Sequence, residues 1–310
     1  MNKVIILLGP TGVGKTGASI LLAKQLDTEI ISADSMQIYR HMDIGTAKPT
    51  AEELSAVPHH MIGIAGPWEA FSTGKYIAAV LPVLKRLHCQ NRIPVVVGGT
   101  GLYIRAMTRG IFRGPSADWT LRQELLSLEQ EERGALYSCL KDIDPLAAGK
   151  ITPNDTRRII RALEVCIAGR MRMSDMQEKL TQPLPCDFLK IGITRERKEL
   201  YRMIEQRVDL MMEKGLLEEV RALMSMNPDR TPLQAIGYKE MAMHLNGTVS
   251  AEEAVRLIKR NTKRYAKRQF TWFRKEEDIE WIDITGVFDH DEVFRRIFNV
   301  LEGRLSQNDL

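Results

Sequence analysis

The chain has 310 residues, of which 44% are hydrophobic and 27% are charged, as in an ordinary globular protein. Its formal net charge of +4 is too small to indicate a partner, so the distribution of charge matters more than the total. No apolar run approaches the roughly 18 residues that cross a membrane, and the run Val4 to Leu8 is too short for a secretion signal. Four cysteines without a Cys-x-x-Cys pair indicate neither a zinc site nor a disulfide framework, and we expect a reducing cytoplasm.

The N-terminal third alternates short apolar runs with helical patterns. Apolar runs at 4–8, 29–32 and 93–97 predict three buried strands, because each run is short and ends at glycine or polar residues. Helical spacing follows the first run from Thr16 to Leu26 and precedes the third from Lys75 to His88. Strands that alternate with helices predict an α/β fold, with a parallel sheet and helices on both of its faces.

The pattern changes in the middle of the chain. The segment 113–185 shows helical periodicity and no convincing strand, and a strand pattern returns only at 188–193. The remainder is mostly helical. We therefore predict a core domain formed by 1–112 and 186–310, interrupted by a helical insertion domain at 113–185.

A glycine-rich loop follows the first apolar run. Glycines let the backbone turn successive N–H groups towards a phosphate, and the helix that follows adds the positive end of its dipole. The lysine supplies a mobile charge, and the hydroxyl of Thr16 suits Mg²⁺. This pattern predicts a P-loop that binds the diphosphate or triphosphate of a small molecule together with Mg²⁺. Its residues are Gly9, Pro10, Thr11, Gly12, Val13, Gly14, Lys15 and Thr16.

The loop alone does not decide the chemistry. Nucleotide hydrolases usually carry an Asp at the end of a second apolar strand, whereas the run 93–97 ends in Gly98-Gly99-Thr100. The acid that does follow a predicted strand is Asp34, at the edge where ligands bind in open α/β sheets. Asp34 is therefore a candidate metal ligand or general base, and a cap at a strand–helix turn is the alternative.

Positive charge is concentrated in two segments. The segment 255–275 contains nine Lys or Arg and no acid, and a helix there places Lys263 and Lys267 on one line. Such a stripe suits nucleic-acid phosphates, although a solvated basic helix that packs through its aromatic residues is the simpler alternative. A second basic group lies in the insertion and consists of Arg157, Arg158 and Arg161.

Several segments, taken in order along nearly the whole chain, together resemble one family, the bacterial tRNA dimethylallyltransferases. The resemblance implies a P-loop NTPase-like core. It also implies transfer of a dimethylallyl group from dimethylallyl diphosphate to the exocyclic amine of the adenine just 3′ of the anticodon. The P-loop then holds a leaving diphosphate and not a hydrolysable triphosphate. The segments are 9–16, 32–39, 43–49, 98–103, 154–165, 236–240 and 262–269.

The resemblance also implies roles for single residues. Lys15, Thr16 with Mg²⁺, and Arg207 would stabilise charge on the diphosphate, although the sequence alone makes Arg207 an exposed charge on a helix. Asp34 would accept or orient a proton of the attacking amine. Contacts with a flipped-out base are expected from Asp34, Ser35, Met36, Gln37, Thr100 and Arg122. Contacts with the anticodon stem are expected from Arg157, Arg158, Arg161, Lys263 and Lys267.

The residues themselves leave three functions open. The first is prenyl transfer to tRNA. The second is a small-molecule kinase of the P-loop class, or a prenyltransferase that acts on free adenine nucleotides. The third is a non-catalytic RNA-binding switch. Two basic surfaces favour RNA, and Asp34 favours catalysis. We expect a monomer without a membrane segment, whose partners are dimethylallyl diphosphate and the anticodon stem-loop of tRNA.

Overall fold

The computed structural model describes residues 2–112 and 114–305 and divides into two compact units. The larger unit, which we call the core unit, combines the segment up to Ile104 with the segment from Pro185. The smaller unit, which we call the helical unit, covers Arg105–Leu184, compared with 113–185 in the sequence prediction. The first boundary therefore lies inside helix α4 (Gly101–Thr108) and not in the loop that follows it.

The core unit is built on a six-stranded parallel sheet with the order β3-β2-β4-β1-β5-β6. The strands predicted from sequence are β1, β2, β4 and β5, and the prediction missed the two edge strands. Strand β3 has only two residues, and β6 follows a segment that reads as continuous helix. The bounds are β1 (Lys3–Leu8), β2 (Ile30–Ala33), β3 (His59–His60), β4 (Val95–Gly98), β5 (Asp187–Thr194) and β6 (Ile279–Asp283).

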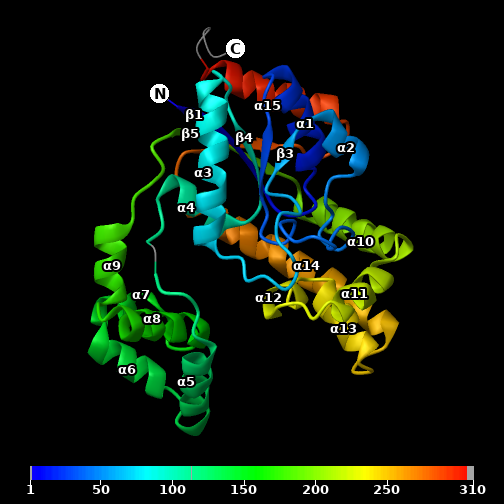
Figure 1. Cartoon of the computed structure of the whole chain (residues 1–310). Coiled ribbons are helices and arrows are strands. Elements are labelled where there is room, and N and C mark those ends of the chain that lie inside the picture. The colour runs from blue at the N-terminus through cyan, green and yellow to red at the C-terminus, as the bar shows by residue number, and fades with distance from the viewer. Residues whose placement is uncertain (1, 113, 306–310) are drawn as a thin grey trace. The chain divides into compact units, whose positions relative to one another are not determined.

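Helices flank this sheet and extend beyond one of its ends (Figure 1). Helix α14 is the longest described here, with 23 residues. The helices of the core unit, apart from the shared α4, are α1 (Lys15–Gln25), α2 (Ala51–Ala56), α3 (Thr73–Cys89), α10 (Arg197–Glu213), α11 (Leu216–Ser225), α12 (Arg230–Leu233), α13 (Tyr238–Leu245), α14 (Ala251–Phe273) and α15 (His290–Glu302).

Both faces of the central strand β1 are buried. Residues Val4 to Leu8 have no exposed surface, and β1 pairs with β4 on one side and β5 on the other. Because successive side chains of a strand point to opposite faces, complete burial of β1 requires cover on both faces. In Figure 1, α3 crosses in front of the sheet, and its Tyr76 hydroxyl donates a hydrogen bond to the Ser32 carbonyl at 3.1 Å.

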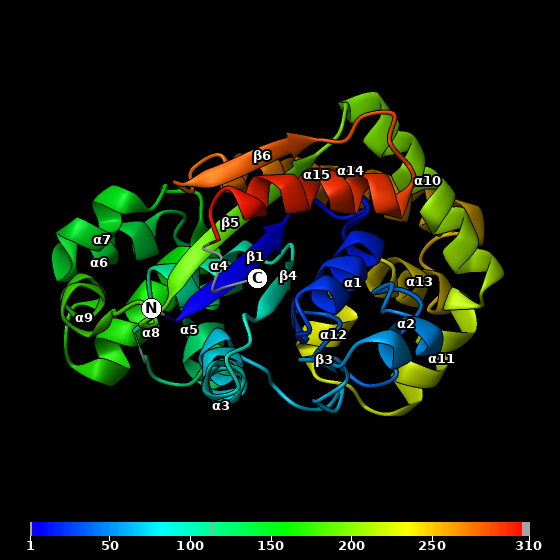
Figure 2. The same ribbon diagram turned by 90° about the horizontal axis from the view of Figure 1, so that it is seen from above.

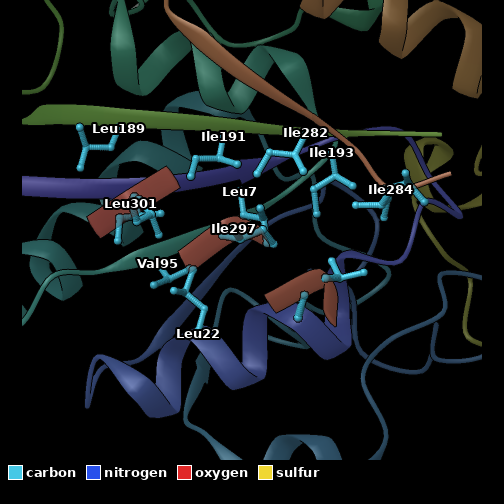
Figure 3. Close-up of a cluster of buried hydrophobic side chains, with 14 of the residues drawn as sticks. Leu7, Leu22, Val95, Leu189, Ile191, Ile193, Ile282, Ile284, Ile297 and Leu301 are labelled. Carbon is cyan, nitrogen blue, oxygen red and sulfur yellow. The ribbon is translucent and has the colours of Figure 1, made fainter. Parts of the chain in front are cut away.

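Helices α1 and α15 lie side by side (Figure 2) and pack on the sheet. The core between them and the strands is aliphatic, with Leu7 and Ile191 from the sheet against Leu22 and Ile297 from the helices (Figure 3). Removal of about 25 cal/mol per Å² of apolar surface from water makes such a layer the main stabilising contribution. This packing holds the loop between β1 and α1 at the carboxyl end of the sheet.

The helical unit has a hydrophobic core of its own. Asp118 and Asp155 cap the first turns of α5 and α8 through their side-chain oxygens. Its helices are α5 (Trp119–Glu131), α6 (Ala135–Ile143), α7 (Pro145–Lys150), α8 (Thr156–Gly169) and α9 (Met173–Leu180). Its buried apolar side chains are Leu136, Leu140, Ala147, Ala148, Ile151, Ile159, Ile160, Ala162 and Leu163.

None of the helices within 2–112 and 114–305 is both long and apolar enough to cross a membrane. The four cysteines are free thiols.

Candidate active site

The carboxyl ends of β1, β2 and β4 meet at one edge of the sheet, where an open cavity of about 290 Å³ lies. This arrangement follows from the parallel topology, because residues that directly follow parallel strands share an edge. The P-loop follows β1, Asp34 follows β2, and Gly99 follows β4. Helices α10 and α14 add further side chains to the wall. The polar residues in that wall include Thr11, Lys15, Thr16, Asp34, Gln37, Arg207 and Gln269.

The P-loop has the backbone that its sequence predicts. Gly12 and Gly14 have φ angles of +81° and +102°, which side chains other than glycine rarely adopt. A Cβ atom at Gly12 would also lie 3.0 Å from Ile204 on α10, so the loop has little room there. Val13 points the other way and is buried in the hydrophobic core. The loop is therefore anchored by one apolar residue and bent by two glycines.

Positive charge gathers in this cavity. The Lys15 ammonium donates hydrogen bonds to the carbonyls of Gly9 and Pro10, both at 2.9 Å. Burial, and then the nearby charge of Arg207, lowers the pKa of Lys15 to about 7, although Asp34 acts in the opposite direction. Burial also lowers the pKa of Arg207, again opposed by Asp34. Two desolvated cations beside one carboxylate make the cavity suited to an additional anion.

Asp34 uses its two carboxylate oxygens differently. Oδ1 accepts hydrogen bonds from the backbone N–H groups of Met36 at 2.8 Å and Gln37 at 3.3 Å. Oδ2 has no hydrogen-bond partner among the residues that the structure describes. The capping role considered from sequence is thus real, although the capped segment is a turn and not a helix. One oxygen holds the turn, and the other stays available to a ligand.

Beside Asp34, the Thr100 hydroxyl joins the ends of β2 and β4. It accepts the backbone N–H of Ser35 at 3.0 Å and donates to the Ser35 hydroxyl at 3.4 Å. The hydroxyl of Tyr265 on α14 lies beside it, and burial, with the charge of Asp34, raises the pKa of Tyr265. Tyr265 is one of the aromatic residues of the basic segment 255–275, and the sequence did not indicate its place at the site.

The Gln37 side chain supports a neighbouring loop. Its Nε2 donates to the carbonyls of Thr46 at 3.3 Å and Ala47 at 3.1 Å, and its Oε1 accepts from the Ser32 hydroxyl at 3.1 Å. Both amide hydrogens are therefore in use. Its amide therefore supports the loop that contains Thr46 and Ala47, and the expected contact of Gln37 with a base edge stays a prediction.

Gln269 is a second residue that the sequence analysis missed. It is only 6% exposed, and its Oε1 accepts the backbone N–H of Thr11 at 2.9 Å. Its Nε2 donates to the carbonyl of Gly99 at 2.8 Å. Gln269 thus joins the P-loop to the turn after β4. The available signal was spacing, since Tyr265 and Gln269 lie four residues apart on one face of a helix.

The basic residues of α14 line a groove next to α10. Lys263 forms an ion pair with Glu205, and Lys259 pairs with Asp209 at 2.6 Å, so part of the predicted charge is neutralised by the core unit itself. In the part of the chain that the structure describes, Lys267 has no acidic partner. The groove is lined by Arg197, Tyr201, Glu205, Arg256, Lys259, Arg260, Lys263, Arg264 and Lys267.

Two arginines of the helical unit are engaged inside it. Arg122 binds the carboxylate of Glu164 through Nε and Nη2, both at 2.9 Å, and Arg161 forms a further ion pair with the same carboxylate. The Glu164 side chain is fully buried. Arg158, by contrast, is 72% exposed, and its one ion pair among the described residues is with Asp155 at 3.3 Å. Arg161 is thus held by Glu164 whereas Arg158 is exposed, and the contact of both residues with the anticodon stem stays a prediction.

The remaining predicted residues are placed as follows. Arg157 is exposed, Met36 is half-buried, and Ser35 and Thr100 lie next to the cavity and not in its wall.

Comparison with known sequences identifies the family. A family model described as IPP transferase matches residues 37–276, and one described as isopentenyl transferase matches residues 2–62. The chain belongs to the IPP transferase family. A tRNA dimethylallyltransferase of Thermodesulfovibrio yellowstonii is 58% identical to this IPP transferase over 308 residues, which cover 97% of this chain and 98% of the relative.

Solved structures agree with this assignment. The full-length tRNA isopentenylpyrophosphate transferase of Bacillus halodurans is 44% identical, with a TM-score of 0.74, and the match covers 99% of this IPP transferase and 98% of that chain. A eukaryotic dimethylallyltransferase acting on tRNA is 28% identical, with a TM-score of 0.78, over 98% of this chain and 80% of that one. The resemblance and the P-loop-like α/β fold that the sequence predicted are confirmed, and the relatives are prenyl-transferring enzymes.

Proposed function

We propose that the protein transfers a dimethylallyl group from dimethylallyl diphosphate to the exocyclic amine of the adenine 3′-adjacent to the anticodon in tRNA. The observation that carries this proposal is the position of Asp34, which lines the same cavity as the P-loop Lys15 and Arg207 and whose Oδ2 has no hydrogen-bond partner among the described residues. A carboxylate beside an anion site suits a reaction in which a diphosphate departs and a proton is removed. The relatives that carry the name tRNA dimethylallyltransferase support it.

The reaction exchanges one bond for another at the allylic carbon. The bond from this carbon to the diphosphate oxygen breaks, and the electron pair leaves with the diphosphate. The amine nitrogen of adenine forms the new bond to carbon, and its proton passes to Oδ2 of Asp34 and then to water. The P-loop N–H groups, Lys15 and Arg207 stabilise the charge that develops on the diphosphate, which is preorganised electrostatic catalysis. Because this amine is a poor nucleophile, positioning contributes as much as basicity.

The residues present also fit Mg²⁺. This ion usually takes one or two protein oxygens together with substrate phosphates and water. The Thr16 hydroxyl, which belongs to the cavity wall, and the donor's diphosphate would supply such a set. The described residues contain no group of three or more His, Cys, Asp or Glu side chains that could hold a metal unaided. When bound, Mg²⁺ neutralises part of the diphosphate charge.

The acceptor adenine must leave the base stack to reach this cavity. Ser35, Met36 and Thr100 adjoin Asp34 and are the proposed neighbours of the flipped base. The groove between α10 and α14 would bind backbone phosphates, through Lys267 and also through Lys263 if RNA displaces its acidic partner. In the helical unit, Arg157 and Arg158 are exposed and are the candidates for contact with the anticodon stem. Arg122 and Arg161 would instead contribute by holding Glu164 and so stabilising the fold of this unit. In this proposal the protein acts as a monomer in the cytoplasm.

Two other activities are less well supported. A P-loop kinase, or a prenyltransferase for free adenine nucleotides, has no need for two exposed basic surfaces or for the helical unit. A non-catalytic RNA switch has no need for a carboxylate oxygen left open beside the P-loop.

The deciding experiment supplies labelled dimethylallyl diphosphate with tRNA, with AMP, and with neither. We expect label in tRNA alone, and release of one diphosphate for each group transferred. Label in AMP would instead support the free-nucleotide enzyme. Binding of tRNA without any transfer would support the switch.

A further inference from the structure

A carboxylate outside the cavity holds one of its walls. The side chain of Glu219 on α11 accepts three consecutive backbone N–H groups, from Asp43 and Ile44 at 2.8 Å each and from Gly45 at 3.0 Å. The hydroxyl of Tyr238 donates a fourth hydrogen bond to the same carboxylate at 2.5 Å. Three successive N–H groups that converge on one anion form a backbone nest, and here the anion belongs to the protein itself.

The nest is closely built. A Cβ atom at Gly45 would lie 2.4 Å from the ring of Tyr238 and 2.9 Å from Leu216, so only glycine fits there. Tyr238 and Leu216 have no exposed surface. The carboxylate of Glu219 is half-buried, and its four hydrogen bonds hold this side chain and the loop backbone against one another.

The same loop reaches the cavity. Thr46 and Ala47 follow the nest directly, line the cavity, and accept the two amide hydrogens of Gln37 through their carbonyls. The backbone N–H of Gln37 in turn binds Oδ1 of Asp34. A continuous series of hydrogen bonds therefore runs from Glu219 through the loop to the turn that orients Asp34.

We propose that Glu219 is a positioning residue that sets the orientation of Asp34 towards the acceptor by anchoring the loop 43–47. This inference rests on the proposed function. Glu219 makes no contact with the P-loop among the hydrogen bonds of the described residues. Its loss should therefore disturb the acceptor side of the cavity and leave the diphosphate side in place.

The chain offers a matched control on the same helix. Glu218 is exposed, and its one ion pair among the described residues is a 3.9 Å contact with Arg221. The variants Glu219→Gln and Glu218→Gln remove the same charge at adjacent positions. Tyr238→Phe is a milder second variant, because it removes one donor and keeps the carboxylate in the nest.

Two measurements test the proposal. In single turnover with saturating dimethylallyl diphosphate and tRNA, Glu219→Gln should slow transfer roughly 10- to 100-fold, because small misplacement of a reacting group has effects of that order. Tyr238→Phe should slow it less, and Glu218→Gln should match wild type. The dissociation constant for inorganic diphosphate should change by less than about twofold in all three variants. The proposal would be overturned if Glu219→Gln and Tyr238→Phe both lost diphosphate affinity in parallel with turnover. It would also be overturned if Glu219→Gln transferred the dimethylallyl group at the wild-type rate.

Amide hydrogen exchange separates this proposal from the proposed function. Without substrates, the N–H groups of Asp43, Ile44 and Gly45 should exchange faster in Glu219→Gln than in Glu218→Gln. Absence of transfer by wild-type protein would contradict the proposed function alone. Unchanged exchange in Glu219→Gln would contradict the anchoring role alone.

Discussion

The side-chain oxygen of Gln269 accepts the backbone N–H of Thr11 across 258 positions of sequence, at 2.9 Å. Through this bond, helix α14 holds the P-loop with one face while its other face lines the basic groove. The second bond of Gln269, to the Gly99 carbonyl, links the P-loop to the turn that carries Thr100. The buried amide of Gln269 thus connects the P-loop, which forms the anion site, to the turn beside Asp34, where the acceptor amine is proposed to bind.

Replacement of Gln269 by Ala should weaken binding of inorganic diphosphate by about 5- to 100-fold. The variant leaves the Thr11 N–H and the Gly99 carbonyl without partners, and an unsatisfied buried polar group costs about 1 to 3 kcal/mol. Titration calorimetry measures the effect. Thr271→Ala, at an exposed position of the same helix, should bind like wild type. Equal affinity in Gln269→Ala and Thr271→Ala would contradict the role of this amide.

Asp34→Asn should lower the rate of prenyl transfer by about 10²- to 10⁴-fold, the usual contribution of a general base. The variant keeps an Oδ1 that can accept from Met36 and Gln37, so the turn should persist and diphosphate affinity should be retained. Asp34→Ala removes the turn contact as well. A rate for Asp34→Ala within about threefold of wild type would remove Asp34 from the mechanism, since a base contributes far more than this.

Binding of diphosphate at pH 8 should be accompanied by proton uptake. With a pKa of about 7, Lys15 is mostly neutral at pH 8 in the free protein, and a bound anion raises that pKa. Calorimetry in buffers of different ionisation enthalpy measures the uptake, which should decline as the pH falls below 7 because Lys15 is then already charged. Lys15→Met should lose it. Identical uptake in wild type and Lys15→Met would assign the proton to another group.

The same shift affects the stability of the ligand-free protein. The folded pKa of about 7 lies below the ordinary lysine pKa of 10.5, so the unfolded chain binds this proton more tightly. The contribution of Lys15 to stability is therefore complete above pH 10.5 and is lost progressively as the pH falls towards 7.

Glu164→Ala should destabilise the helical unit by about 3 to 5 kcal/mol. The variant removes the carboxylate that Arg122 and Arg161 share, so that both guanidinium groups lose their acidic partner. Burial alone would raise the pKa of Glu164, but the hydrogen bonds from Arg122 and Arg161 lower it overall and so favour the charged carboxylate. Chemical denaturation followed in this unit gives the free energy of unfolding. Glu178→Ala, at an exposed position of α9, should leave it unchanged. A loss below about 1 kcal/mol would make the cluster an ordinary surface ion pair.

Charge reversal at Arg158 or Lys267 should weaken binding of tRNA and leave diphosphate binding unchanged. Each lost phosphate contact should reduce the slope of log affinity against log salt by about one. Arg158→Glu and Lys267→Glu should fold normally, since Arg158 is exposed and Lys267 has no acidic partner among the described residues. Lys24→Glu, an exposed change on α1, is the control for net charge. Unchanged affinity at low salt in both variants would exclude these positions from the RNA surface.

The sequence by itself determined the elements whose signals are local. The P-loop needs glycines and a lysine at set spacings between a strand and a helix, and those spacings are visible in 9–16. Asp34 was identifiable because it directly follows a buried strand, and the ends of parallel strands share an edge. The helical unit was identifiable because 113–185 lacks strand patterning. The edge strands β3 and β6 were not, because one is very short and the other lies within a mostly helical region.

Only the tertiary structure decided what the polar side chains contact. Helical spacing places Tyr265 and Gln269 on one face but does not show that this face meets the P-loop and Thr100. In the same way, Arg161 reads as a solvent-exposed charge until the buried Glu164 is placed next to it. Glu219 resembles its exposed neighbour Glu218 in every local property, and only the fold brings it to three N–H groups of a distant loop. The physical reason is that hydrogen bonds and ion pairs act over about 3 Å in space, whereas the chain positions that they join are set by packing.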